Sequence, residues 1–504
     1  MGARLSKSRF GVHNLPSFES LLAYVGDPLS LQFLLEIFPY RTIVEKVSWS
    51  ILAYFLILNV CNLLLNILAL TSIKSRQEKR LEELPQLHSD LQLPISILVP
   101  AFNESVTIAS SVRSLLQLSY TNYEIIVIND GSQDDTMAVL QREFALIPIP
   151  PAYPVQIPTG QVHGIFQSTR HIQLRVIDKA NGGKADALNA GINLARYSLF
   201  CGVDADSVLE RDSLQHVIRP FLRDPTVVAT GGTVRVANGC QFKNGHLNEV
   251  ALPKNPLALF QIIEYVRAFL LSRLGWSALN GVIIISGAFG VFKKTVVVAA
   301  GGYRTKTMGE DMELVVRIHR LLRAQKERYR IVFVPEPVCW TETPEDFKTL
   351  RTQRIRWQRG LCESLAANWG LMLSRNPGVV GGIAFPFMVL FELLGPLIEL
   401  GGYLFMVIVW AAGWVSLDMV YAFLFVSIGL GTLLSISSLL LEEMIFHLYK
   451  TRHLALLGLF ALLENFGYHQ LSSYWRLIGL YRWVNEKDGN WGIMKRKGEW
   501  QSAV

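Results

Sequence analysis

The chain has 504 residues, of which 50% are hydrophobic, and its mean hydropathy is +0.29. This apolar balance excludes an ordinary soluble enzyme, and the length suffices for one catalytic domain together with membrane helices. The net charge of +7 does not indicate nucleic acid as a partner, because basic residues cluster beside apolar runs, at 74–80 and 495–497, as they do at a membrane surface. The five cysteines form no Cys-x-x-Cys pair, so the sequence predicts neither a zinc site nor a disulfide framework.

The N-terminal part is predicted to contain one membrane span. Residues 1–46 are read as short interfacial helices, because their apolar residues are interrupted by Gly26, Asp27 and Pro28. Residues 47–73 carry no formal charge and exceed the roughly 20 apolar residues that a spanning helix needs. Because a mixed segment precedes this run, we predict a retained transmembrane helix and not a cleaved signal peptide. The basic linker at 74–93 should then face the cytoplasm.

From residue 94 onward, short apolar strands alternate with helices, which is typical of a parallel sheet covered on both faces. We predict four such strands, ending near residues 99, 128, 178 and 203. Sheets of this kind bind ligands beyond the carboxyl ends of their strands. Polar side chains follow all four ends: Asn103 and Glu104, then Asp130, then Lys184, then Asp204 and Asp206. The sequence therefore predicts an α/β domain over 94–376 with a ligand site along one sheet edge.

The two aspartates after the fourth strand are candidate metal ligands. Asp204 and Asp206 are spaced i, i+2, so they leave the strand on one face, and a slight twist lets their oxygens converge on one hard cation. Mg²⁺ or Mn²⁺ carrying a diphosphate is the cation that this arrangement suits. The alternative is that both residues only begin the turn before a helix at 207–219.

A second acidic motif opens a later helix. Glu310 and Asp311 precede Leu314 and Ile318, which recur at helical spacing. Acidic residues in a first helical turn complement the helix dipole, and that role alone explains their presence. The residues by themselves leave open whether the carboxylates also take part in chemistry.

Residues 351–360 combine several arginines with Trp357. A solvated basic face is the usual explanation for such a run. A tryptophan among arginines also suits a site that holds an anionic leaving group beside a stacked sugar ring. Residues 257–276 form an amphipathic helix with aromatic and basic members, expected either at the bilayer interface or packed within the domain.

The membrane block at 377–483 is predicted to contain about three spans, the first broken by Pro396, the second near 419–440 and the third near 454–483. Glu392 and Glu399 share one helix face, either lining a sugar-polymer conduit or hydrogen-bonding between helices. Three spans would leave the basic tail at 484–504 outside, against the usual charge bias, whereas an interfacial last segment would return it to the cytoplasm.

The motifs VPAFNE, NDGS, GGKADALN, VDADS, GED and QRIRW occur in one order over about 94–365. Together they resemble those of the membrane-integrated, processive members of glycosyltransferase family 2, namely cellulose, hyaluronan, chitin-oligomer and poly-N-acetylglucosamine synthases. The resemblance implies a GT-A fold, which is a Rossmann-like, mostly parallel α/β sheet, inserted here between transmembrane helices.

The resemblance also implies roles for single residues. Ala101, Asn103, Glu104 and Asp130 would hold the uridine, Lys184 would approach the nucleotide-sugar, and Asp204 and Asp206 would take the diphosphate and its metal. Asp311 would be the general base with Glu310 beside it, and Gln353, Arg354, Arg356 and Trp357 would line the diphosphate and acceptor. The family motif is most often Thr-Glu-Asp, whereas this chain has Gly309 at the first position.

We therefore expect an inverting, metal-dependent glycosyltransferase that uses Mg²⁺ or Mn²⁺ and extends a β-linked polysaccharide from a UDP-sugar at the cytoplasmic membrane face. Its partners would be the UDP-sugar, a growing polysaccharide or glycolipid acceptor, and the lipid bilayer. Whether the polymer is translocated and whether an accessory membrane subunit takes part stay open. One alternative is a non-processive transferase that adds a sugar to a lipid, against which QRIRW argues. Another is a catalytically silent nucleotide-sugar-binding scaffold, against which the intact Asp204, Asp206 and Asp311 argue.

Overall fold

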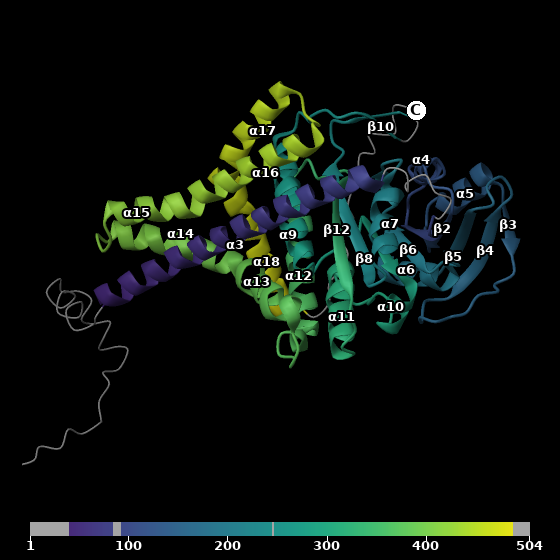
Figure 1. Ribbon diagram of the computed structural model, residues 1–504, viewed down its shortest axis with the longest axis horizontal. Coiled ribbons are helices and arrows are strands. Elements are labelled where there is room, and N and C mark those ends of the chain that lie inside the picture. The colour runs from purple at the N-terminus through teal and green to yellow at the C-terminus, as the bar shows by residue number, and fades with distance from the viewer. Residues whose placement is uncertain (1–39, 84–91, 244–245, 487–504) are drawn as a thin grey trace, which may run out of the picture.

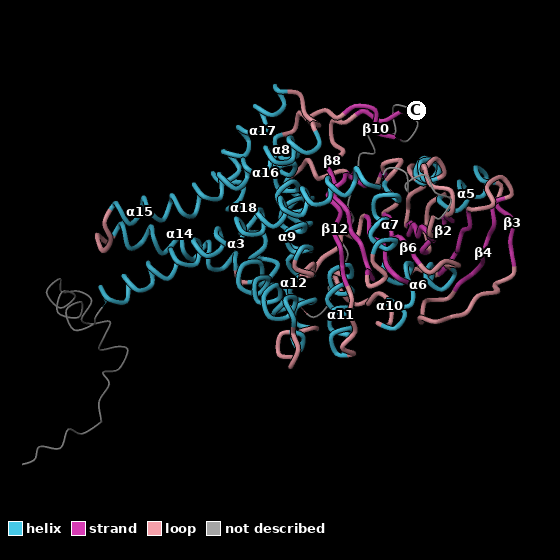
Figure 2. The backbone as a smooth tube through the Cα atoms, viewed as in Figure 1, coloured by secondary structure: helices cyan, strands magenta, loops and turns pink. Residues whose placement is uncertain are grey.

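A computed structural model describes residues 40–83, 92–243 and 246–486. Three predicted segments lie partly outside the described residues. These are the N-terminal segment at 1–46, of which 40–46 are described, the linker at 74–93, of which 84–91 are not described, and the tail at 484–504, of which 484–486 are described. A sheet domain lies at one side of the molecule, and helices α3, α14, α15 and α16 extend away from it (Figure 1). Figure 2 shows the same division, with the strands gathered at one side and the helical extension almost free of them.

The central element is a ten-stranded mixed sheet with the strand order β3-β4-β5-β2-β1-β6-β11-β8-β12-β7. Its strands are β1 (Ile95–Ala101), β2 (Tyr123–Asp130), β3 (Leu146–Ile149), β4 (Val162–Ser168), β5 (Leu174–Lys179), β6 (Leu199–Val203), β7 (Val208–Leu209), β8 (Val227–Val236), β11 (Phe289–Lys293) and β12 (Arg330–Thr341). Strands β5, β2, β1 and β6 run parallel, as do β8 and β12, and β11 is antiparallel to both of its neighbours. The central strands are nearly fully buried, because helices cover a parallel sheet on both faces.

The helices of this domain are α4 (Ile108–Leu115), α5 (Thr136–Phe144), α6 (Lys184–Leu194), α7 (Ser213–Arg223), α10 (Lys294–Ala299) and α11 (Glu310–Ala324). Helix α6 packs on β1 and β2, and α7 packs on β8 and β12. The irregular stretch near 238–256 contains a two-stranded hairpin, β9 (Gln241–Lys243) with β10 (His246–Glu249).

Two long helical segments connect the sheet to the membrane helices. The first is α8 (Pro256–Tyr265), which continues through the π-helical turn η3 (Val266–Ser272) into α9 (Arg273–Ala278); the second is α12 (Phe347–Ala367), followed by η4 (Trp369–Leu371). Helix α9 packs against the N-terminal helix α3 (Tyr40–Glu83). An ideal Cβ placed on Gly275 would lie 2.5 Å from the carbonyl oxygen of Leu65, so only glycine permits this approach of the two backbones.

The C-terminal helices are η5 (Val380–Ala384), α13 (Phe385–Phe387), η6 (Met388–Leu393), α14 (Gly395–Ala411), α15 (Leu417–Leu424), η7 (Phe425–Gly429), α16 (Leu430–Phe446), α17 (Thr451–Leu463), η8 (Glu464–Tyr468) and α18 (His469–Asn485). Within the described part of the chain, Thr42–Lys74 and Leu417–Phe446 are long and apolar enough to cross a membrane, and Val380–Leu393 with Gly395–Ala411 forms a pair bent by 46°.

The segment expected as a third C-terminal span, at 454–483, is two helices. The chain breaks at Phe466 and at Gly467, whose φ of 109° lies in the region that favours glycine, so α17 and α18 do not form one continuous helix. Helix α18 packs on α12 and α14, which brings the last helix back to the catalytic domain. Whether this last segment lies at the membrane interface stays a prediction.

Two charge pairs, one buried on both sides and one with a partly exposed arginine, join the sheet domain to the membrane helices. Arg235 on β8 pairs with Glu442 on α16, and their side chains are 4% and 1% exposed. Arg267 on η3 pairs with Glu464 on η8, Nη2 to Oε1 at 2.8 Å, and also donates to the hydroxyl of Ser435. An ion taken out of water is tolerated only when its partner is present, so these pairs require the two parts to dock in one register.

We expect Glu442→Leu to lower the free energy of unfolding by about 3–5 kcal/mol, because the substitution leaves the buried Arg235 without its counter-charge. The double variant Arg235→Leu/Glu442→Leu should recover most of that loss, since replacing both partners leaves no buried charge. Thermal unfolding of the detergent-solubilised protein measures the stability of the single variant and of the double variant. Additive losses in the double variant would contradict this account of the junction.

Candidate active site

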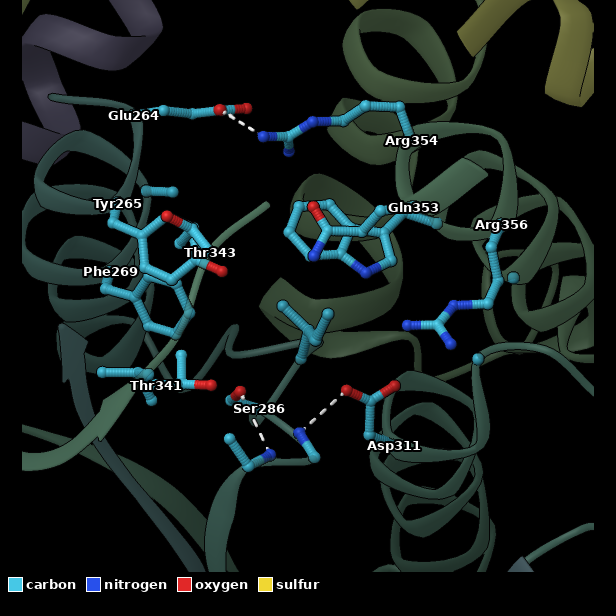
Figure 3. Close-up of a pocket in the computed structure, with 18 of the residues that line it drawn as sticks. Glu264, Tyr265, Phe269, Ser286, Asp311, Thr341, Thr343, Gln353, Arg354 and Arg356 are labelled. Carbon is cyan, nitrogen blue, oxygen red and sulfur yellow. Dashed lines mark hydrogen bonds and ion pairs between the residues drawn. The ribbon is translucent and has the colours of Figure 1, made fainter. Parts of the chain in front are cut away.

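A cavity of about 1820 Å³ lies where the carboxyl ends of β1, β2 and β6 face α11, α12 and the α8–η3–α9 segment. The structure brings every site residue named from the sequence to its wall: Ala101, Asn103, Glu104, Asp130, Lys184, Asp204, Asp206, Glu310, Asp311, Gln353, Arg354, Arg356 and Trp357. Figure 3 shows part of this wall, with Tyr265 and Phe269 on one side and Asp311 and Arg356 on the other.

The ends of β1 and β2 are tied together at the cavity wall. Asn103 has a positive φ of 57°, a conformation that asparagine tolerates better than most residues, and its backbone N–H donates to the Ser132 hydroxyl at 3.0 Å. Its side-chain oxygen accepts from the N–H of Gln133 at 2.8 Å. The backbone N–H of Glu104 donates to the Thr136 hydroxyl at 2.9 Å. These bonds hold the VPAFNE and NDGS motifs in one fixed relation.

Asp130 organises the glycine loop that precedes α6. Its carboxylate accepts from the N–H groups of Gly182 and Gly183 at 3.0 and 2.7 Å and from the ammonium of Lys179 at 2.6 Å. Lys179 is 0% exposed and also pairs with Asp186 at 2.6 Å. Neither Lys179 nor Asp186 is among the site residues predicted from the sequence, although a lysine that ends a buried apolar strand is a signal for a buried partner.

Lys184 opens α6 and faces the carboxylates across the cavity. Its ammonium pairs with Asp204, lies 3.9 Å from a carboxylate oxygen of Glu310, and donates to the carbonyl of Gly287 at 3.1 Å. Burial alone would lower the pKa of Lys184, but the carboxylates of Asp204 and Glu310 outweigh it and hold the pKa above its ordinary value. Lys184 therefore stays charged at the centre of the acidic cluster.

Two backbone N–H groups orient Asp311. The N–H of Gly287 donates to one carboxylate oxygen at 3.0 Å and that of Met312 to the other at 2.8 Å. Figure 3 shows this carboxylate at the edge of the cavity, on the side where Arg356 also lies. Such a fixed carboxylate next to an open space can accept a proton from a bound hydroxyl.

The glycine that replaces threonine in the GED motif has a packing reason. An ideal Cβ on Gly309 would lie 3.0 Å from Cα of Gly360, and one on Gly360 would lie 2.8 Å from N of Gly309. Helices α11 and α12 therefore meet backbone to backbone at this point. A threonine at this position would force the two helices apart.

Helix α12 presents the QRIRW motif. The side chain of Asp346 caps its N-terminus by accepting from the N–H of Thr349 at 2.8 Å. Arg354 is ion-paired with Glu264 on α8 at 2.6 Å and lies over the Trp357 ring, with its guanidinium carbon 4.5 Å from the ring centroid. Arg356 lies toward Asp311, on the other side of the cavity from Glu264 (Figure 3).

The cavity continues between the membrane helices, where polar and apolar side chains share its wall. The polar members are Tyr54, Asn59 and Asn62 of α3 with Glu392, Glu399, Ser427, Asn465, His469, Ser473 and Arg476, and apolar side chains such as Phe55, Leu58, Phe391 and Leu434 lie beside them. Glu399 accepts from the Ser473 hydroxyl at 2.7 Å and lies 3.1 Å from a ring nitrogen of His469, and Glu392 pairs with Arg476 at 2.8 Å. Glu392 and Glu399 thus share a face, as expected, and both line the cavity and bond to a neighbouring helix.

Residues 93–360 match the protein-family model described as glycosyltransferase like family 2, which covers more than half of the chain. This protein is a family 2 glycosyltransferase. Its catalytic domain has the α/β GT-A fold, as the motifs predicted.

Curated relatives include poly-beta-1,6-N-acetyl-D-glucosamine synthases. That of Staphylococcus aureus strain COL is 30% identical over 280 residues, or 56% of this chain and 57% of the relative. That of Staphylococcus epidermidis is 29% identical over 289 residues, 57% of this chain and 59% of the relative. This chain thus matches between half and two thirds of the length of these relatives.

Solved structures matched to the chain include a mannosyltransferase and the protein TarS. The mannosyltransferase PcManGT from Pyrobaculum calidifontis, in complex with GDP-Man and Mn²⁺, matches with a TM-score of 0.45 and 16% identity, covering 85% of this chain and 99% of that one. S. aureus TarS 1–349 in complex with UDP matches with a TM-score of 0.37 and 13% identity, covering 76% of this chain and 91% of that one.

The acidic cluster of this family 2 glycosyltransferase fits a divalent cation that binds together with a diphosphate. Within 40–83, 92–243 and 246–486, no group of three or more His, Cys, Asp or Glu side chains forms a complete metal site. Mg²⁺ at nucleotide sites is held by one or two carboxylates plus substrate phosphates, so a full protein cage is not required. Asp204 and Asp206, just beyond β6 on the cavity wall, are the residues that would supply that partial set.

Glu310 provides a pH-dependent contribution to the stability of the ligand-free transferase. Burial raises the pKa of Glu310 to about 7, with Lys184 opposing and Asp311 reinforcing the shift. The folded protein therefore holds this proton more tightly than the unfolded chain, in which glutamate titrates near 4.5. The stability that this proton confers is fully present below pH 4.5, the pKa of glutamate in the unfolded chain. It is lost as the pH rises through about 7, the pKa in the folded protein.

We expect the melting temperature of the ligand-free wild type to fall relative to Glu310→Gln between about pH 5 and pH 8, because glutamine mimics the protonated acid at every pH. The shift from 4.5 to about 7 limits the loss of stability at high pH to about 3.4 kcal/mol. Thermal unfolding of both proteins over this pH range gives the comparison. A difference in melting temperature that stays constant with pH would contradict the assigned pKa.

Proposed function

We propose that this family 2 glycosyltransferase is an inverting, metal-dependent enzyme that extends a β-linked polysaccharide from a UDP-sugar and passes the product into the membrane. The observation that carries this proposal is the single cavity that contains the sheet-edge carboxylates and continues between the membrane helices. A growing chain needs such an exit beside the site of transfer. The names of the curated relatives favour an N-acetylglucosaminyl donor.

The nucleotide end of the donor would occupy the wall formed by Ala101, Asn103, Glu104 and Asp130. Lys184 and the Asp204–Asp206 pair lie next along the wall and suit the diphosphate. When bound, Mg²⁺ or Mn²⁺ would supply charge that offsets the negative charge developing on the departing UDP. Arg356 and Gln353 are proposed to add donors for the same leaving group.

Asp311 is proposed as the general base. A sugar hydroxyl is a poor nucleophile, so a carboxylate within hydrogen-bond reach has to take its proton as the new glycosidic bond forms and the bond to UDP breaks. The N–H groups of Gly287 and Met312 fix the carboxylate in orientation. A single in-line displacement of this kind inverts an α-linked donor to a β-linked product.

Trp357 is proposed to carry the acceptor sugar. Its side chain lines the cavity and the residue is 43% exposed, which leaves apolar ring surface available to the flat face of a pyranose. Arg354 covers one face of the indole, so the sugar would stack on the other.

The orientation in the membrane is part of the proposal. The basic residues at 74–80 follow the first apolar helix, and the positive-inside rule then assigns the catalytic domain to the cytoplasm. The polar wall of Asn59, Ser427, Asn465 and Ser473 supports translocation of a hydroxyl-rich polymer, because it offers hydrogen-bond partners within an otherwise apolar bundle.

We expect Asp311→Asn to lower turnover by about 10²- to 10⁴-fold while UDP binding persists, because an amide keeps the shape but cannot accept the proton. Transfer from a radiolabelled UDP-sugar and UDP affinity by calorimetry measure the two effects. Glu310→Gln is the matched comparison, since it removes the neighbouring charge at the same helix start. If Glu310→Gln is the variant that loses turnover with binding intact, the base is Glu310 and not Asp311.

We expect Gly431→Trp to shorten the product sharply while the first transfers to a short acceptor continue. Gly431 lines the membrane section of the cavity, and an indole there would fill the path of the polymer. Gly401→Trp on α14 is the control, because an ideal Cβ at Gly401 meets no atom within 4 Å and the residue does not line the cavity. Product sizing by gel electrophoresis compares the two, and equal product lengths would argue against the conduit.

A further inference from the structure

Trp357 and Arg354 form a stacked pair on α12. They are three residues apart, so both side chains leave the helix on neighbouring positions of one face. The guanidinium carbon lies 4.5 Å from the centroid of the indole ring, within the range of a cation–π contact. The guanidinium and the indole are therefore in direct contact.

Arg354 is itself held by residues from two other helices. One of its terminal nitrogens lies 2.6 Å from a carboxylate oxygen of Glu264 on α8 and 3.5 Å from the hydroxyl of Tyr468 on η8. The Tyr468 hydroxyl donates to the same Glu264 oxygen at 3.1 Å. The Tyr468 ring stacks on Phe260, one helical turn before Glu264, with ring centroids 4.7 Å apart.

The guanidinium has little freedom to move elsewhere. The Arg354 side chain is almost completely buried, so it depends on Glu264 for its counter-charge, whereas Glu264 is partly open to the cavity. Figure 3 shows the ion pair at the end of the cavity away from Asp311, with Arg356 on the other side. Arg354 is thus engaged at the acceptor end of the wall, and its neighbour in the motif, Arg356, lies toward the base.

We infer that Glu264 is a positioning residue for the acceptor, which sets the plane of the Trp357 indole through Arg354. The inference rests on the proposed role of Trp357 as the acceptor platform. Without the carboxylate, the buried guanidinium would turn toward other acceptors and the indole would gain rotamers, so the sugar would no longer be held in line with the donor. Small misplacements of a reacting group lower transfer strongly, because positioning supplies much of the rate.

The competing explanation is that the Glu264–Arg354 pair only stabilises the junction between helices. The chain offers a matched control for this explanation, because Arg267 and Glu464 form a second ion pair between the same helical segment and the same η8 turn. Glu464 does not line the cavity. A purely structural role predicts the same effects for both pairs.

The test measures steady-state kinetics of the full-length transferase in nanodiscs, with UDP-N-acetylglucosamine as donor and a β-1,6-linked N-acetylglucosamine oligosaccharide as acceptor. We expect Glu264→Gln to raise the acceptor KM about tenfold and to leave the donor KM within about twofold. Glu464→Gln should lower the melting temperature and leave the acceptor KM unchanged. In a Trp357→Ala background, Glu264→Gln should add no further change in acceptor KM, since its effect passes through the indole.

If the acceptor KM is unchanged in Glu264→Gln but raised in Trp357→Ala, the inference about Glu264 is wrong while the proposed function stands. A full additional loss in the double variant, or an equal rise of acceptor KM in Glu464→Gln, would also overturn the inference. If Trp357→Ala itself leaves acceptor KM and product length unchanged, the acceptor assignment in the proposed function fails first. Should Glu264→Gln not fold, Arg354→Met removes the same link from the other end and should give the same split between acceptor and donor KM.

Discussion

Charge pairs between the sheet domain and the membrane helices hold these two parts of the molecule together. Arg235 and Arg267 come from the catalytic half, and their partners Glu442 and Glu464 come from the membrane half. Each ion would cost several kcal/mol if it were buried alone, so the pairs admit only the docking in which both are satisfied. In that docking the cavity wall within the bundle meets the carboxyl edge of the sheet.

The acidic cluster at that edge is balanced by one lysine. Lys184 faces Asp204 and Glu310 and feels the charge of Asp311, so carboxylates outnumber the ammonium. A cluster with this excess of negative charge suits the arrival of a cation together with the donor, and it holds one carboxyl, that of Glu310, near the midpoint of its titration at neutral pH. The sheet geometry places these side chains together, and their charges then determine which of them are ionised.

Local patterns were sufficient to predict four of the ten strands, namely β1, β2, β5 and β6, and the polar residues that follow them. Strands such as β1 and β2 are continuous apolar runs, and the polar residues that follow them come together because parallel strands end at one edge. The contacts that support these residues were not predictable in this way. Glu264 and Arg354 are 90 positions apart in sequence, and Lys179 meets Asp130 across 49 positions, so no local pattern connects them.

The membrane block shows a second limit of local patterns. Composition alone suggested a span at 454–483, but the backbone of Phe466 and Gly467 breaks the helix, and α18 packs on α12. Tertiary contacts such as those of Arg476 with Glu392 and Gln358 decide the course of this segment, and hydropathy does not register them.

The crossing of α11 and α12 at Gly309 and Gly360 has a mechanical consequence. Because the two backbones touch with no side chain between them, there is no soft layer that would let one helix slide over the other. Asp311 follows two residues after the first glycine, and Trp357 precedes the second by three. In the proposed function, the general base Asp311 and the acceptor platform Trp357 would therefore lie on two helices whose separation is set by main-chain atoms.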